Sequence, residues 1–94
     1  MTIMKLGIYK NDTVHPRDYV NRRYMASRLY GYAQFPVSFN RLKEIEYSIL
    51  HEIKRKYRGY MREHFIVPTS QVREFARYVK HVVLRHKREL LQDT

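Results

Sequence analysis

The chain has 94 residues, a length that suits one domain with a modest hydrophobic core. Lysine and arginine number 19 against 9 aspartates and glutamates, and this net charge of +10 points to a polyanionic partner, either a nucleic acid or an anionic membrane surface. The absence of cysteine excludes disulfides, thiol catalysis and cysteine-bound zinc, and no apolar run approaches the roughly 20 residues of a membrane-spanning helix.

Residues 2–10 alternate weakly between apolar and polar side chains, with Met4, Leu6 and Ile8 on one side. The pattern is typical of a short strand, but the rest of the chain is predicted to be helical and supplies no strand to pair with. We therefore expect residues 1–15 to form an extended arm that lies over the helices or pairs with another chain. The segment lacks the features of a signal peptide, so the expected location is intracellular, in the cytoplasm, nucleoid or nucleus, or inside a virion.

A first helix is predicted over residues 16–33. Pro16 suits the first helical position, and Asp18 complements the positive end of the helix dipole. Apolar and small side chains share one broad face of this helix, which Arg22 interrupts. Pro36 follows the predicted end.

A second helix is predicted over residues 40–65, because apolar side chains recur there every three or four positions. They are Leu42, Ile45, Ile49, Ile53, Tyr57 and Tyr60. Glu46 falls inside this stripe and could pair with Arg22, since buried charges need partners. A column of cations occupies the opposite face: Lys54, Arg58 and Arg62. Like charges at this spacing repel, so the column implies good solvation or an external anion.

A third helix is predicted over residues 70–91 and has the cleanest apolar stripe in the chain. Its other side is basic and carries Arg73, Arg77, Lys80, Lys87 and Arg88. Leu84 and Leu91 lie seven residues apart among these cations. They suggest a contact with a partner helix or a second copy, so a homodimer or a higher homo-oligomer is expected; the alternative is two half-exposed leucines, which are common.

These three stripes, bounded by prolines, predict a single all-α domain over residues 1–94, with three helices and a short extended N-terminal arm.

One segment carries a more specific pattern. Residues Met61–Phe75 read MREHFIVPTSQVREF, with five apolar side chains spaced to close a small wedge between two crossing helices. These are Met61, Phe65, Val67, Val72 and Phe75. The segment resembles the helix-turn-helix superfamily of DNA-binding proteins, in which a short turn joins two helices and the second helix starts with polar side chains.

The segment departs from that superfamily at two positions. Arg62 stands where a small residue normally lets the helices approach. Ile66 stands where a glycine normally takes positive φ, which is costly for a β-branched residue. The alternative interpretation is a plain helical hairpin that breaks at Pro68.

The resemblance implies that the third helix lies in the major groove of DNA. Gln71 would then address adenine, and Arg73 or Arg77 guanine, while the other cations hold phosphates. The predicted nucleic-acid-binding residues are Lys54, Arg58, Arg62, Thr69, Ser70, Gln71, Arg73, Arg77, Lys80 and Arg88.

Tyrosines are unusually frequent and lie among arginines. There are nine, and segments such as RLYGY at 28–32 interleave the two residue types. A tyrosine can fill the edge of a core and still offer its hydroxyl to a phosphate, or it can stack on a base.

No pattern of catalytic or metal-binding residues is recognisable. His51 and Glu52 begin like a zincin motif, but Arg55 stands where the second ligand is needed. The five histidines do not place two on one helical face near a third ligand. The chain is therefore predicted to be neither an enzyme nor a binder of metal or cofactor.

The predicted function is a duplex-DNA-binding transcriptional regulator of helix-turn-helix type, acting as a homodimer without contact with a membrane. One alternative is a packaging protein without sequence preference, such as a chromatin component or a viral coat or nucleocapsid protein. Another is a basic assembly subunit of a ribonucleoprotein or larger complex. Discrimination between random and selected DNA separates a regulator from a packaging protein.

Overall fold

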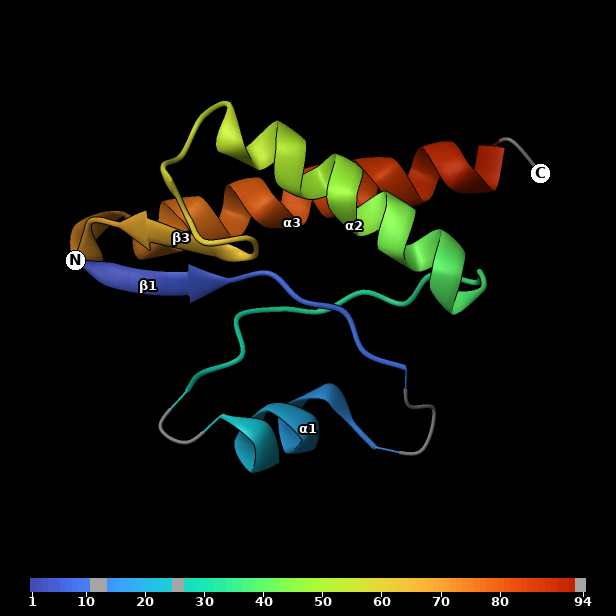
Figure 1. Ribbon diagram of the computed structural model, residues 1–94, viewed down its shortest axis with the longest axis horizontal. Coiled ribbons are helices and arrows are strands. Elements are labelled where there is room, and N and C mark those ends of the chain that lie inside the picture. Colours follow the sequence, from blue (N-terminus) through green and yellow to red (C-terminus); the bar gives the residue numbers. More distant parts are fainter. Residues whose placement is uncertain (11–13, 25–26, 93–94) are drawn as a thin grey trace.

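The computed structural model describes residues 1–10, 14–24 and 27–92. Its helices are α1 (Pro16–Arg23), α2 (Phe39–Lys54) and α3 (Val72–Gln92), with a single 3₁₀ turn, η1 (Thr69–Gln71), directly before α3. Its strands are β1 (Thr2–Lys5), β2 (Gly59–Tyr60) and β3 (His64–Val67) (Figure 1). The domain thus combines helices with a sheet, and the prediction of an all-α domain is wrong.

The sheet is antiparallel with the order β1-β3-β2. In β3, alternate side chains face the core, so that Phe65 and Val67 are fully buried. Met4 of β1 pairs with Phe65 and is also buried, while Ile3 pairs with Ile66 on the other face. Within the expected N-terminal arm, residues 2–5 therefore form a strand of this chain's own sheet. The predicted helix over 40–65 ran into β3, because a short apolar run such as that of residues 64–67 fits a strand and a helix equally well.

A tight turn joins β2 to β3. Met61 lies in this turn with φ 59°, and within the described ranges it is the one residue other than glycine with positive φ. The backbone N–H of Ile66 donates to the carbonyl of Arg58 at 3.1 Å and continues the hairpin. The expectation of positive φ at Ile66 is wrong, because this residue sits in the extended backbone of β3.

Helix α2 begins as its sequence predicts but ends eleven residues early. Ser38 caps the start of this helix, since its hydroxyl accepts a hydrogen bond from the backbone N–H of Arg41 at 3.2 Å. The helix ends at Lys54 instead of residue 65. Gly59 starts β2, and a glycine has a low helix propensity.

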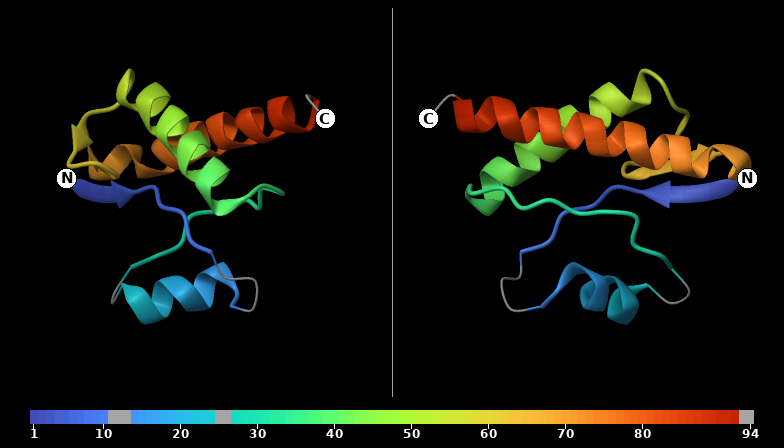
Figure 2. Two further views of the ribbon diagram at one scale, coloured as in Figure 1. Left: turned by 45° about the vertical axis from the view of Figure 1, so that its right-hand side comes forward. Right: turned by 180° about the vertical axis from the view of Figure 1, so that it is seen from behind.

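Helices α2 and α3 pack together around the core, and Figure 2 shows them crossing. The buried side chains of the core are Met4, Ile45, Ile49, Leu50, Ile53, Phe65, Val67, Val72, Phe75 and Val82. At the edge of the contact, Arg85 of α3 donates a hydrogen bond to Glu52 of α2. His86 lies 3.6 Å from the same carboxylate. The observed bounds of α3 agree with the predicted helix over 70–91 to within two residues.

Helix α1 is shorter than predicted and lies away from the core (Figure 1). It ends at Arg23 instead of residue 33, and none of its residues is buried. The stacked rings of Tyr9 and Tyr19, with centroids 4.4 Å apart, connect it to the segment after β1. Arg22 is exposed and makes no ion pair with Glu46, so the predicted pairing is wrong. Residues 27–33, which were predicted to be helical, form no helix.

Candidate nucleic-acid interface

The segment Met61–Phe75 does not form two helices joined by a turn. Met61 lies in the hairpin turn and is 74% exposed, and Phe65 and Val67 belong to β3. Only from Val72 onward is the segment α-helical. The wedge of apolar side chains does exist, apart from Met61, but it joins a strand to a helix. Residues 61–75 therefore do not form the two helices of a helix-turn-helix.

The outer face of α3 is the largest continuous feature among the predicted binding residues. At about 100° per residue, four exposed cations lie opposite the buried stripe of this helix. They are Arg73, Arg77, Lys80 and Arg88, and we call them the α3 cation row. The row extends for about 22 Å at the usual helical rise of about 1.5 Å per residue. Its exposure makes it accessible to a long, linear partner.

No carboxylate in the described part of the chain forms an ion pair with the α3 cation row. The neighbouring Arg85 forms ion pairs with both Glu52 and Glu89, the latter at 3.6 Å. Its hydrogen bond holds the pKa of Glu52 below the usual value for a glutamate. Arg85 thus engages Glu52 and Glu89, whereas Glu74 lies on α3 between Arg73 and Arg77 and forms no ion pair with either of them.

The predicted column of Lys54, Arg58 and Arg62 is not a column in the structure, because the helix that should carry it ends at Lys54. Arg58 stands just before β2, and Arg62 lies in the turn between β2 and β3. All three are exposed. Lys54 packs its aliphatic stem beside Gly59, where an added Cβ would lie 3.4 Å from the Lys54 Cγ. These cations surround the α2–β2 loop and the hairpin, at a different place from the predicted helix face.

Aromatic contacts join that loop to α3. The ammonium group of Lys56 lies 4.4 Å from the ring centroid of Tyr78 and 5.8 Å from that of Tyr57. The Tyr57 ring in turn meets Phe75 edge to face, with centroids 4.9 Å apart. The loop cations are thereby anchored against the N-terminal half of α3.

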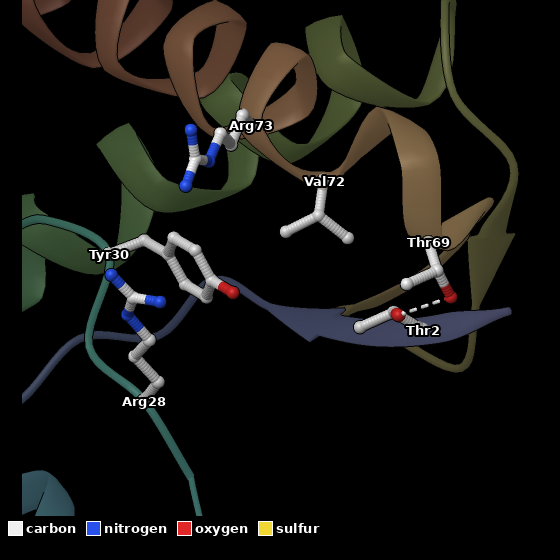
Figure 3. A pocket seen from close by; sticks show the side chains of 6 residues that line it. All are labelled: Thr2, Arg28, Tyr30, Thr69, Val72 and Arg73. Carbon is white, nitrogen blue, oxygen red and sulfur yellow. Dashed lines mark hydrogen bonds between the residues drawn. The ribbon is translucent and has the colours of Figure 1, made fainter.

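A pocket of about 340 Å³ opens where α3 begins (Figure 3). It is lined by Thr2, Arg28, Tyr30, Thr69, Val72 and Arg73. The hydroxyls of Thr2 and Thr69 share a hydrogen bond of 2.9 Å. The guanidinium of Arg28 lies 5.1 Å from the ring centroid of Tyr30.

The pocket unites predicted and unpredicted residues. Thr69 and Arg73 belong to the predicted binding set, whereas Thr2, Arg28 and Tyr30 do not. The interleaved RLYGY segment was the one sequence signal that pointed to Arg28 and Tyr30. The remaining predicted residues, Ser70 and Gln71, are exposed in η1 next to the pocket.

Other chemistry is sparse. Across the residues that the structure describes, no group of three histidine, aspartate or glutamate side chains could hold a metal ion. His51 is exposed and stacks on Tyr47, with ring centroids 5.2 Å apart. Within the same residues, every helix is too short or too polar to cross a bilayer.

Comparison of the chain with protein-family models, with curated proteins and with solved structures found no match. Function is therefore inferred from the residues of this chain alone.

Proposed function

We propose that this protein is a non-enzymatic nucleic-acid-binding protein whose expected partner is duplex DNA. The observation that supports the proposal is the α3 cation row, which is exposed and has no carboxylate partner among the described residues. Each cation that neutralises a phosphate releases a condensed counterion, and this release supplies most of the affinity of such proteins for DNA.

The shape of α3 is compatible with this partner. A major groove about 12 Å wide admits one helix, and the four cations of the α3 cation row are exposed. The contact does not require a helix-turn-helix, since α3 is positioned here by the sheet and by α2. The pairing of β3 with β1 places the start of the helix, and the core side chains fix which face points outward.

A sequence-specific regulator and a packaging protein would both use these phosphate contacts. Exposed cations also surround the α2–β2 loop and the hairpin, where Lys54, Arg58 and Arg62 lie. This second group favours the packaging alternative, because two separate basic surfaces can hold two segments of nucleic acid. A regulatory role with base reading by Gln71 and Arg73 stays a prediction.

The proposal is tested by measuring affinity for a random-sequence duplex between about 50 and 200 mM salt. A triple variant, Arg77→Ala with Lys80→Ala and Arg88→Ala, should lower the slope of log affinity against log salt by about three. The matched control removes three exposed cations elsewhere: Lys10→Ala with Arg17→Ala and Arg22→Ala. The control should change the slope much less.

Equal losses in the two triple variants would mean that net charge, and not the α3 face, attracts DNA. Failure of the unmodified protein to bind any nucleic acid at low salt would contradict the proposal and favour the assembly-subunit alternative.

Base reading is tested separately with Arg73→Ala and Lys54→Ala. If α3 reads bases, Arg73→Ala should cost about 1–3 kcal/mol on a selected site and relax preference at one position. Lys54→Ala should weaken binding to all sequences alike. Equal, sequence-independent losses in both variants would support the packaging alternative.

A further inference from the structure

We propose that the pocket at the start of α3 binds a phosphate monoester, such as the terminal phosphate of a nucleic-acid strand or the phosphate of a mononucleotide. The inference concerns the chemical class of the group that this pocket selects. For the terminal phosphate of a nucleic-acid strand, the inference rests on the proposed function.

Three parts of the chain that are distant in sequence converge on this pocket. Thr2 comes from β1, Arg28 and Tyr30 come from residues 27–37, and Arg73 comes from α3. Figure 3 draws the Tyr30 ring between the two arginines, with its hydroxyl directed toward Val72 and the threonines. The pocket therefore depends on the folded chain and not on one local motif.

The polar groups that line the pocket can all donate hydrogen bonds. Arg28 and Arg73 carry guanidinium groups, which have donors and no acceptor. Thr2 and Thr69 share one hydrogen bond, so one of their two hydroxyl protons is left to donate. Tyr30 adds a further hydroxyl. The oxygens of an ionised phosphate only accept, so the donors of this pocket match them.

The charge of the pocket selects a monoester over an internal phosphodiester. No carboxylate lines the pocket, and neither Arg28 nor Arg73 has an ion pair within the described residues. The two guanidinium groups therefore present two positive charges. A monoester carries about −1.5 to −2 at neutral pH and has three terminal oxygens, whereas a diester carries about −1. Only the monoester can balance both arginines.

The size of the pocket agrees with a ligand of this kind. Its volume of about 340 Å³ is at the lower end of the range of about 300–1,000 Å³ that is usual for small-molecule sites. Val72 is apolar, and the Tyr30 ring offers a stacking surface, so a sugar or base attached to the phosphate has a place to lie.

The first experiment compares three forms of one oligonucleotide duplex, which carry a 5′-phosphate, a 3′-phosphate or no terminal phosphate. We expect one phosphorylated form to bind at least about tenfold more tightly than the unphosphorylated form. Arg28→Ala should abolish this difference between the phosphorylated and unphosphorylated duplexes. The matched control Arg55→Ala, an exposed cation outside the pocket, should keep the difference.

A second experiment measures binding of a nucleoside monophosphate and of inorganic phosphate. Saturable binding that Arg28→Ala removes would support the monoester site and identify a free nucleotide as a source. Arg28→Lys, which keeps the charge but loses the two-pronged donor geometry, should restore the affinity only in part.

A pH series gives an independent readout. Discrimination should fall as the pH drops through the second pKa of a phosphate monoester, near about 6, because arginine stays charged. Equal affinity for all three duplexes, together with no binding of mononucleotide or phosphate, would overturn the inference. Mononucleotide binding that depends on Arg28, in a protein that binds no nucleic acid, would support the pocket and reject the proposed function.

Discussion

Met61 holds the turn between β2 and β3 in a backbone conformation that side chains other than glycine rarely adopt. Its side chain is largely exposed and contributes nothing to the core, so the conformational cost has no packing gain to offset it. We expect Met61→Gly to increase the free energy of unfolding by about 0.5–1 kcal/mol. Urea unfolding measures this change.

The neighbouring Arg62 provides the control, because no positive φ is required there. Arg62→Gly should leave the stability unchanged or lower it. A loss of stability in Met61→Gly would contradict the assigned turn.

Glu46 is a partly buried carboxylate with one oxygen that lacks a hydrogen-bond partner among the described residues. Its Oε2 atom is inaccessible and accepts no hydrogen bond from the described residues. Burial raises the pKa of Glu46, the like charge of Glu63 raises it further, and Lys5 opposes the shift. The folded state therefore binds the proton more tightly than the unfolded state does.

From this shift we predict the effect of pH. Ionised Glu46 destabilises the fold at neutral pH, and the penalty disappears as the pH falls through the raised folded pKa toward the unfolded value. Glu46→Gln should therefore be more stable than the parent protein at pH 7, and the difference should vanish near pH 4. Thermal unfolding across this pH range measures it. Glu44→Gln, at an exposed glutamate on the same helix, should show no such gain.

The binding residues show what sequence can predict at this scale. Thr69 and Arg73 were identified because they belong to one local segment at the start of a helix. Arg28 and Thr2 could not be placed in the pocket from the sequence. Arg28 reaches it through the path of residues 27–37, and Thr2 reaches it through the pairing of β1 with β3. The positive φ was placed at Ile66 by analogy with a turn between helices, whereas the hairpin moved it to Met61.

At the scale of secondary-structure elements, the strand β3 allows a prediction about stability, because adjacent side chains of a strand face opposite sides of the sheet. Phe65 is fully buried, whereas Ile66 faces away from the core beside Ile3. Phe65→Ala should cost about 3–5 kcal/mol of unfolding free energy. Ile66→Ala should cost distinctly less, and urea unfolding compares the two. Equal costs would be inconsistent with a strand that buries one face.

The elements were predictable where a long amphipathic stripe supports them. Helix α3 matched its prediction because 21 residues keep one apolar face. The prediction for the second half of the helix over 40–65 was wrong. Apolar residues at helical spacing continue past Gly59, but there they belong to strands. The stripe alone did not distinguish a helix that continues from one followed by a hairpin. The strand prediction for residues 2–10 lacked a partner for the same reason.

At the scale of the whole molecule, the homodimer stays a prediction. Leu84 is 42% exposed and Leu91 is 50% exposed, and both lie on the outer side of α3. Sedimentation at tens of micromolar protein should detect a dimer, and replacing both leucines with glutamine should weaken it without unfolding the domain. Tyr47→Gln, at an exposed aromatic residue on α2, is the control and should leave association unchanged.

The same face of α3 carries the cation row, so a dimer that uses these leucines would compete with DNA. Excess DNA should therefore shift the sedimentation profile toward a form with one protein copy on each site. A monomer at every concentration without DNA would contradict the homodimer.

The topology of the sheet also determines when this chain can fold during its synthesis. The central strand β3 has one partner close by in sequence, but β1 precedes it by most of the chain, and the linked hydroxyls of Thr2 and Thr69 are 67 residues apart. At typical rates of about 5–20 residues per second, β1 is synthesised roughly 3–12 seconds before its partner strand. During this interval β1 has no strand of its own sheet to pair with. The sheet can therefore form only after residues 64–67 are synthesised, although its strand β1 is made about 60 residues earlier.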